Sequence, residues 1–234
     1  MSDARILDCG CGTGANLRLL ARFGRAYGFD LSDVGVSIAR LSGRTRLARA
    51  SVAAVPFPSD SFDLVTSFDV LYSLETHDER AAVSEMYRLL RPGGYALVNV
   101  AAMPALTGNH SVLSREVRRY TRTSLRELLT ASGFTIVRIT YTNCTLFAPL
   151  LAIRTFHRWR GLSTETETQQ EITVPTSPVN AALTVILLLE SLWLRHFDQP
   201  FGSSLLCLAQ KPDGDPGGSS AGRSRSPSFR LPVR

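Results

Sequence analysis

The sequence predicts an α/β fold built on a doubly wound, mostly parallel sheet. Short apolar runs alternate with amphipathic runs at helical spacing, and turn residues separate them. The glycine-rich stretch "DCGCGTGA" at residues 8–15 directly follows the first apolar run. Sheets of this class bind their ligands at such loops, outside the carboxyl ends of the strands. A chain of 234 residues is long enough for one such domain with additional segments.

The apolar runs place the strands and helices of the predicted sheet. The expected strands are Arg5–Cys9, Ala26–Asp30, Arg46–Val52, Phe62–Ser67, Tyr95–Val100 and Thr135–Thr140. The expected helices are Asn16–Phe23, Asp33–Leu41, Glu79–Leu90 and Thr123–Ala131. Ser32 is the expected N-cap of the second helix, because its hydroxyl can accept a bond from the first turn. The stretch "RPGG" at residues 91–94 is expected to end the third helix.

The pattern changes after the sixth strand. Residues 145–197 are predicted to form a helical insertion, which includes a strongly apolar helix at Val179–Leu194. A last strand is expected at Ser203–Ala209, and the predicted domain spans residues 1–211. Residues 212–234 are rich in Gly, Ser, Pro and Arg, a composition that predicts a disordered tail.

Charge and cysteine usage limit the possible partners. The net charge is +6, and arginine carries almost all of the positive charge. No basic stripe interleaved with aromatic residues is present, so we expect no nucleic-acid partner. An anionic membrane surface remains a possible partner of the basic residues. The four cysteines show no metal-ligand spacing and no histidine cluster accompanies them, so no metal is expected. With no leader peptide recognisable before the first strand, the predicted location is cytoplasmic.

The glycine stretch is compatible with two nucleotide cofactors. Gly10, Gly12 and Ala15 fit the G-x-G-x-x-A pattern of dinucleotide-binding loops. Asp30 ends the second predicted strand, 20 residues after Gly10, where its carboxylate could accept hydrogen bonds from ribose hydroxyls. Both features suit NAD and S-adenosylmethionine equally. A Rossmann-like domain that has lost its ligand is a third interpretation.

Three further features favour S-adenosylmethionine. Asp8 lies two residues before Gly10, where an anion would repel a pyrophosphate but attract a cationic amino group. The stretch "VPFPSDSFDLV" at residues 55–65 leads into the fourth strand, and "RPGG" leads into the fifth. Together these residues resemble the class I S-adenosylmethionine-dependent methyltransferases, and in particular the type 11 methyltransferase domain. The resemblance covers roughly residues 4–140.

The resemblance implies a seven-stranded sheet whose last strand, here Ser203–Ala209, is antiparallel. It implies that the cofactor is bound by Asp8, Gly10, Gly12, Gly14, Asp30, Leu31, Ser51, Val52 and Phe68. Members often have an Asp-Ala pair where this chain has Ser51-Val52, and a hydroxyl is the weaker acceptor for an adenine amino group. Members also usually carry one or two helices before the first strand, which cover the cofactor, whereas this sequence begins at the strand.

Residues 103–121 offer the candidate catalytic groups. This segment contains His110 and Tyr120 and is similar to an "H…RRYT" stretch in a bacterial subgroup of the family. His110 has an ordinary pKa near neutrality, which suits a general base, and Tyr120 is the second candidate. The alternative is that His110 is an ordinary loop residue and Tyr120 only packs.

The sequence thus predicts a methyltransferase that acts on a small or lipid-like acceptor. The 9-residue apolar run Ala181–Leu189 is too short to span a bilayer, but the insertion could contact the inner face of the membrane as a peripheral element. A non-catalytic module of the same fold that binds S-adenosylmethionine or a partner is the alternative. An NAD enzyme of the short-chain class is a third possibility, and it lacks a Tyr-x-x-x-Lys pair here.

Overall fold

The computed structural model describes residues 3–106, 116–147, 149, 151, 152, 155 and 177–213. The strands are β1 (Arg5–Cys9), β2 (Arg25–Asp30), β3 (Leu47–Arg49), β4 (Phe62–Phe68), β5 (Leu90–Ala101), β6 (Thr135–Thr142) and β7 (Ser204–Gln210). The α-helices are α1 (Ala15–Leu20), α2 (Asp33–Leu41), α3 (Thr76–Leu89), α5 (Arg122–Ala131) and α8 (Ser177–Trp193). Two 3₁₀ turns are η1 (Leu71–Ser73) and η2 (Pro104–Leu106).

The predicted fold class is confirmed. The seven strands form one sheet in the order β3-β2-β1-β4-β5-β7-β6, and β7 runs antiparallel to both of its neighbours. The other pairings of the sheet are parallel. The order reverses between β1 and β4, so the ends of these two strands flank the point where a doubly wound sheet binds its ligand.

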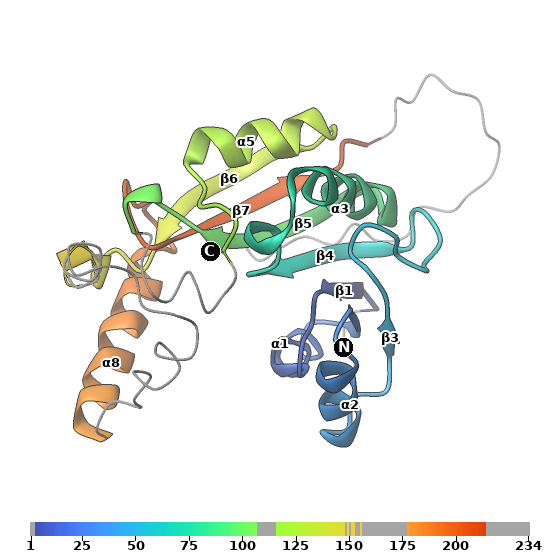
Figure 1. The fold of residues 1–234 in the computed structure, drawn as a ribbon, viewed down its shortest axis with the longest axis horizontal. Coiled ribbons are helices and arrows are strands. Elements are labelled where there is room, and N and C mark those ends of the chain that lie inside the picture. The colour runs from blue at the N-terminus through green and yellow to red at the C-terminus, as the bar shows by residue number, and fades with distance from the viewer. Residues whose placement is uncertain are drawn as a thin grey trace.

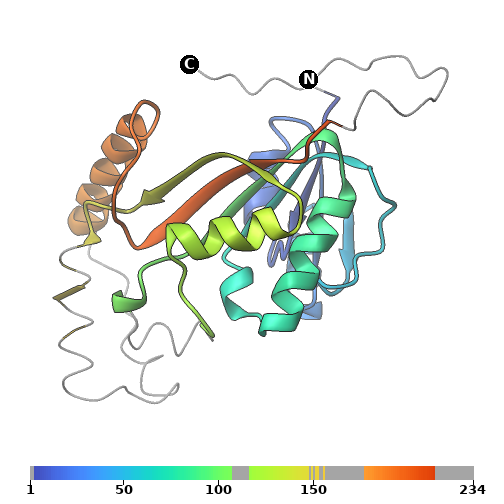
Figure 2. The same cartoon turned by 90° about the horizontal axis from the view of Figure 1, so that it is seen from above.

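Helices cover both faces of the sheet (Figure 1). α3 packs on β4 and β5, and α5 packs on β6, on the upper face in that view. α1 and α2 lie on the opposite face, against β1, β2 and β3. Figure 2 shows α8 set apart from the other helices, at the end of the sheet where β6 ends and β7 begins.

Two apolar clusters hold these layers together. The larger cluster lies between the sheet and the α3–α5 layer and includes Val65, Val83, Leu89, Val98 and Leu129. The smaller cluster lies under α1 and consists of Ile6, Cys11, Leu17, Leu20 and Leu64. Cys9 and Cys11 are buried, as predicted from their place at the strand-to-loop turn, and burial raises the pKa of Cys11 to about 12.

The helix predictions hold at α2 and need correction elsewhere. α2 has the predicted bounds, and the Ser32 hydroxyl accepts a bond from the Gly35 amide at 3.1 Å, which confirms the N-cap. α1 is shorter than predicted: it ends at Leu20, and Phe23 is exposed rather than packed. α3 begins at Thr76, three residues before the predicted start.

The third helix ends just before "RPGG", one residue earlier than predicted, but the strand that follows begins five residues before its predicted start at Tyr95. α3 ends at Leu89 and β5 begins at Leu90, so residues 91–94 lie inside the strand. They sit where the pairing with β4 shifts from Phe62↔Leu90 to Leu64↔Tyr95. Proline and glycine are tolerated in such an irregularity because the regular ladder is interrupted there. β3 is also shorter than predicted, at three residues.

The predicted insertion and tail are described only in part. α8 confirms an apolar helix between β6 and β7. Among the residues described, no helix is long and apolar enough to cross a bilayer. The predicted tail at residues 212–234 lies outside the described residues from 214 onward, and the domain boundary at residue 211 stays a prediction.

Two leucines at helix ends provide a stability test of this fold. Leu89 ends α3 and is fully buried, whereas Leu41 ends α2 and is 89% exposed. We expect Leu89→Ala to lower the free energy of unfolding by about 2–5 kcal/mol, because it removes buried apolar contacts and leaves a cavity in the core. Leu41→Ala is the matched control and should change it by less than about 0.5 kcal/mol. Urea denaturation followed by circular dichroism measures both, and equal effects would contradict the packing described.

Candidate cofactor and acceptor site

The glycine loop between β1 and α1 folds across the end of β2. The amides of Gly10 and Cys11 both donate to the carbonyl oxygen of Phe29, each at 2.9 Å. Gly10 has a φ of +75°, and a Cβ built there would lie 2.4 Å from a methyl group of Val70. Only glycine therefore lets the segment after β4 approach the loop this closely.

Gly12 presents the open side of the same loop. Its φ is +51°, and a Cβ built there would meet nothing within 4 Å. The Gly12 amide donates to Asp30 Oδ2 at 2.7 Å, and the Ser32 amide donates to Asp30 Oδ1 at 2.8 Å. Asp30 thus fixes the loop and the start of α2 together. Each of its oxygens keeps a second lone pair that can accept a ribose hydroxyl.

Asp8 is buried beneath this loop, with 1% of its surface exposed. Its Oδ1 accepts a hydrogen bond from the Thr66 hydroxyl at 2.7 Å, while its buried Oδ2 has no partner among the residues that the structure describes. Burial raises the pKa of Asp8 to about 6; the Thr66 hydrogen bond opposes this rise, and the charge of Asp30 adds to it. A buried carboxylate oxygen without a partner is costly, so Asp8 is suited to a cationic group from a ligand.

The residues predicted for the adenine side line the ends of the next strands. Leu31 directly follows Asp30 and is 67% exposed. Ser51 and Val52 follow β3; the Ser51 hydroxyl accepts a bond from the Ala53 amide at 3.3 Å, and Val52 packs against the larger apolar cluster. Leu31 therefore places an apolar surface beside the Asp30 carboxylate, where a planar base could pack if Asp30 binds the ribose as predicted.

Gly14 and Phe68 complete the predicted set. Gly14 is buried at the start of α1, and its amide donates to the carbonyl oxygen of Cys11 at 2.9 Å. Phe68 is half-buried at the end of β4. The predicted cofactor residues thus lie at or just after the carboxyl ends of neighbouring strands. Their roles in binding stay predictions.

These residues fit S-adenosylmethionine by their chemistry. The methionine amino group is cationic and would satisfy the unpartnered oxygen of Asp8. The ribose hydroxyls would donate to Asp30, and the open face of Gly12 leaves room for the methionine part. A pyrophosphate would instead bring negative charge close to Asp8 and Asp30. Among the described residues, no cluster of His, Cys, Asp and Glu could hold a metal ion.

The segment at residues 116–121 lies against the end of β5 and against η1. The amides of Val117 and Arg118 both donate to the carbonyl oxygen of Tyr72, at 2.9 and 3.2 Å. The Tyr120 amide donates to the carbonyl oxygen of Ala101 at 2.9 Å. The segment that follows β4 and the segment that follows β5 are therefore joined by backbone hydrogen bonds.

Tyr120 is buried in a polar network on the α3 side of this segment. Its hydroxyl donates to Glu79, and the guanidinium of Arg118 pairs with the same carboxylate and reaches the Thr76 hydroxyl at 3.2 Å. Burial raises the pKa of Tyr120, and the hydrogen bond to Glu79 raises it further. Tyr120 therefore keeps its proton and acts as a hydrogen-bond donor here. This contact favours a structural role, and a catalytic role for Tyr120 stays a prediction.

A cavity of about 680 Å³ opens beside this network, between α3 and α5. Glu79, Arg118, Arg119 and Tyr120 line it together with residues of α5. Arg119 is buried and is held by Glu116 at 2.7 Å and by the carbonyl oxygen of Ala102 at 2.9 Å. The other catalytic candidate, His110, lies outside the described residues.

Sequence reasoning missed the contacts that join these two regions. Val70, whose side chain closes on Gly10, and Glu79, which binds both Tyr120 and Arg118, were not among the predicted site residues. Glu79 lies at the start of an amphipathic helix and is 41 residues from Tyr120 in the sequence. An acidic residue on the buried face of that helix was the one available signal, and the spacing alone does not reveal its partner.

Comparison with known proteins identifies the domain. Residues 7–98 match the family model described as "Methyltransferase domain". The matched range holds the glycine loop, Asp30 and the strands of the site. The chain contains a class I methyltransferase domain. The family implies S-adenosylmethionine as the cofactor of this domain.

Relatives of the methyltransferase domain match only part of the chain. A "Probable S-adenosylmethionine-dependent methyltransferase" of Mycolicibacterium smegmatis is 32% identical over 135 residues, which are 56% of this chain and 52% of that protein. The ubiquinone/menaquinone biosynthesis C-methyltransferase of Pectobacterium atrosepticum is 33% identical over 119 residues, 44% of this chain and 45% of that protein. The chain thus spans about half the length of the curated relatives it matches.

Solved structures confirm the fold. A chain in the complex between the Haloferax volcanii Trm112 methyltransferase activator and a methyltransferase superposes with a TM-score of 0.60 at 19% identity. The match covers 90% of this chain and 84% of that one. At this identity the similarity concerns the fold alone.

The pKa of Asp8 predicts a pH dependence of cofactor binding. At pH 5, one unit below a pKa of about 6, only about a tenth of Asp8 is ionised. We expect the affinity for S-adenosylmethionine to be about tenfold lower at pH 5 than at pH 7.5, because the amino group then meets a neutral carboxyl group. Titration calorimetry at the two pH values measures this difference.

Asp8→Asn is the control for this pH effect. The variant should bind more weakly at pH 7.5 and show no rise in affinity between pH 5 and 7.5. The free energy of unfolding of the ligand-free protein depends on pH in the opposite direction to the affinity. The pKa of Asp8 is about 6 in the folded state and 3.8 in the unfolded state, so the folded state binds more protons between about pH 4 and 6. The contribution of Asp8 to the free energy of unfolding is present below this window and is lost as pH rises through it. A wild-type affinity independent of pH would refute the contact with the amino group.

Asp30 provides a second test of the cofactor site. Asp30→Ala removes the acceptor for the Gly12 amide and for the ribose hydroxyls, so we expect cofactor affinity to fall by about 2–3 kcal/mol. Asp33→Ala is the matched control, because Asp33 pairs with Arg49 in an exposed salt bridge and is not among the predicted cofactor residues. Calorimetry should show a change below about 0.5 kcal/mol for the control. An unchanged affinity in Asp30→Ala would rule out the ribose contact.

Proposed function

We propose that this chain is an S-adenosylmethionine-dependent methyltransferase that acts on a small or lipid-like acceptor. The observation that carries the proposal is the buried Asp8 oxygen beneath the glycine loop, for which the described part of the chain provides no hydrogen-bond partner. It provides a site for a cation next to a carboxylate, Asp30, that is suited to a ribose. NAD offers the ribose but no ammonium group that could donate a hydrogen bond to the Asp8 oxygen.

The chain's own residues have few chemical tasks in such a reaction. S-adenosylmethionine supplies an electrophilic methyl group on a sulfonium. The protein must hold the acceptor's lone pair in line with that methyl group, and it needs a base only if the acceptor has to lose a proton. His110 is the proposed base, and the segment joined to η1 by Val117 and Arg118 is the proposed wall of the acceptor site. Glu79 and Tyr120 support that wall from the α3 side.

A lipid-like acceptor is the finer part of the proposal. One relative of the domain is named for ubiquinone and menaquinone biosynthesis, and another is named a sterol 24-C-methyltransferase. In this chain, α8 exposes several leucine and valine side chains, which are suited to contact with a lipid-like acceptor. Cytoplasmic location with peripheral contact at the inner face of the membrane is part of this proposal, since an amphiphilic acceptor resides there.

Cofactor choice is the first test of this function. Titration calorimetry with S-adenosylmethionine and with NAD should show binding of the former that is at least about tenfold tighter, because only its amino group satisfies Asp8. Tighter binding of NAD would overturn the proposal. Cofactor that binds but is never turned over across quinone, sterol and acyl acceptors would instead favour the non-catalytic module.

A further inference from the structure

α8 carries an exposed apolar face along its outer side. Val185, Leu188, Leu189, Leu192 and Trp193 follow the spacing i, i+3, i+4, i+7, i+8, so they lie on one side of the helix. Their exposed fractions range from 50% to 61%. Five neighbouring large side chains with this exposure are unusual on a surface that faces only water. We refer to these five residues as the outer face of α8.

The opposite side of α8 is fixed to the body of the molecule. Glu190 is buried, and its carboxylate accepts bonds from the amides of Cys144 and Thr145, each at 3.0 Å, and from the Thr145 hydroxyl at 2.6 Å. Arg138 on β6 donates to the carbonyl oxygen of Leu194 at 2.6 Å and so caps the end of the helix. These contacts set the rotation of α8 about its axis, so the outer face is directed outward by specific bonds.

The end of α8 combines aromatic and basic side chains. The rings of Trp193 and Phe197 lie 4.5 Å apart, and both side chains are more than half exposed. Arg195 lies between them in the sequence and is exposed, and no carboxylate of the described residues pairs with it. Tryptophan and arginine next to an apolar helix are typical of the interface between lipid headgroups and acyl chains.

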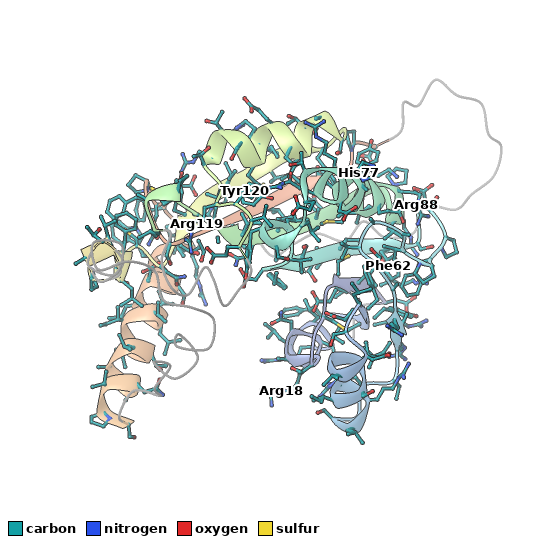
Figure 3. All side chains as sticks on the ribbon, viewed as in Figure 1. Arg18, Phe62, His77, Arg88, Arg119 and Tyr120 are labelled. Carbon is teal, nitrogen blue, oxygen red and sulfur yellow. The ribbon has the colours of Figure 1, made fainter. Side chains whose placement is uncertain are left out.

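A second patch of this kind lies on α1 and the turn after it. Arg18 and Arg22 are exposed, and among the residues described no carboxylate pairs with either. Leu19 and Phe23 lie beside them with about half of their surfaces exposed. Figure 3 shows Arg18 pointing away from the sheet, and Figure 1 shows α1 and α8 extending from the same side of the sheet. We refer to these four residues as the α1 patch.

We infer that the outer face of α8 and the α1 patch together form one surface that docks on an anionic lipid bilayer. α8 would lie in the interface with its outer face among the acyl chains, and Arg18, Arg22 and Arg195 would contact anionic headgroups. The inference deepens the proposed function, in which the acceptor is lipid-like, by assigning residues to its membrane contact. Its test uses no methyl transfer, so a failure of this surface is distinguished from a failure of cofactor binding or methyl transfer.

Charge favours a bilayer over a second copy of the chain. A symmetric contact through α8 would bury the outer face, but it would leave the arginines of the α1 patch without an acidic partner. The chain carries a net charge of +6, so two copies repel each other, whereas an anionic bilayer attracts each of them. A bilayer satisfies the apolar and the basic residues at once.

Flotation with lipid vesicles tests this surface on the full chain. Vesicles of phosphatidylcholine with phosphatidylglycerol should carry the wild-type protein at low salt, and vesicles of phosphatidylcholine alone should carry much less. The double variant Leu189→Asn, Leu192→Asn should bind roughly tenfold or more weakly, because two apolar side chains no longer enter the acyl region. Val137→Asn is the control, since Val137 is 52% exposed on β6 outside both patches, and it should bind as the wild type does.

A second pair of variants tests the charge. Arg18→Gln with Arg22→Gln should remove most of the preference for anionic vesicles, while Arg126→Gln on α5 should keep it. Circular dichroism verifies that each variant is folded. The inference is overturned if the wild-type protein stays unbound at low salt, or if the α8 variant binds as well as Val137→Asn. It is also overturned if light scattering shows that the α8 variant turns a dimer into a monomer while vesicle binding is unchanged, since the outer face would then be a dimer interface.

Discussion

The carboxylate of Asp30 joins the loop after β1 to the start of α2. One oxygen holds the Gly12 amide and the other holds the Ser32 amide, so the glycine loop and the start of α2 share one anchor. One residue earlier, the carbonyl oxygen of Phe29 accepts from Gly10 and Cys11. The end of β2 therefore shapes the loop before any ligand arrives. A loop that is already ordered loses little conformational entropy when it binds, which leaves more of the interaction energy for affinity.

The region after β4 couples the two sides of the proposed site. Val70 closes on Gly10, and two residues later the carbonyl oxygen of Tyr72 accepts from Val117 and Arg118. Behind this link, Glu79 binds both the Tyr120 hydroxyl and the Arg118 guanidinium. A buried carboxylate is stable when it is paired and hydrogen-bonded in this way. The segment after β5 is thus positioned from both ends, by backbone bonds to η1 and by side-chain bonds to α3.

Local chemistry explains which parts of this structure the sequence could predict. Ser32 caps α2 within three residues, and Asp8 and Gly12 belong to one short motif with left-handed glycines, while Asp30 is placed by the end of the second strand. The strands of the buried sheet were visible as apolar runs. α3 ends just before "RPGG" as expected, but the start of β5 was placed too late, because turn residues tolerated at a strand irregularity look the same in sequence as those of a loop. Contacts such as Glu79 with Tyr120 depend on how α3 packs, which no local pattern encodes.

Glu190 has a consequence for how α8 can vary over evolutionary time. A helix advances about 100° for each residue, so one residue inserted between Leu189 and Glu190 would turn Leu188 and Leu189 by about 100° relative to this anchor. Insertions or deletions of three or four residues, about one helical turn, would nearly restore the direction of these side chains relative to Glu190. The bonds from Cys144 and Thr145 to this one carboxylate therefore fix the rotation of the helix about its axis. Length changes in this insertion should accumulate outside α8, while α8 itself changes by substitution or in whole turns.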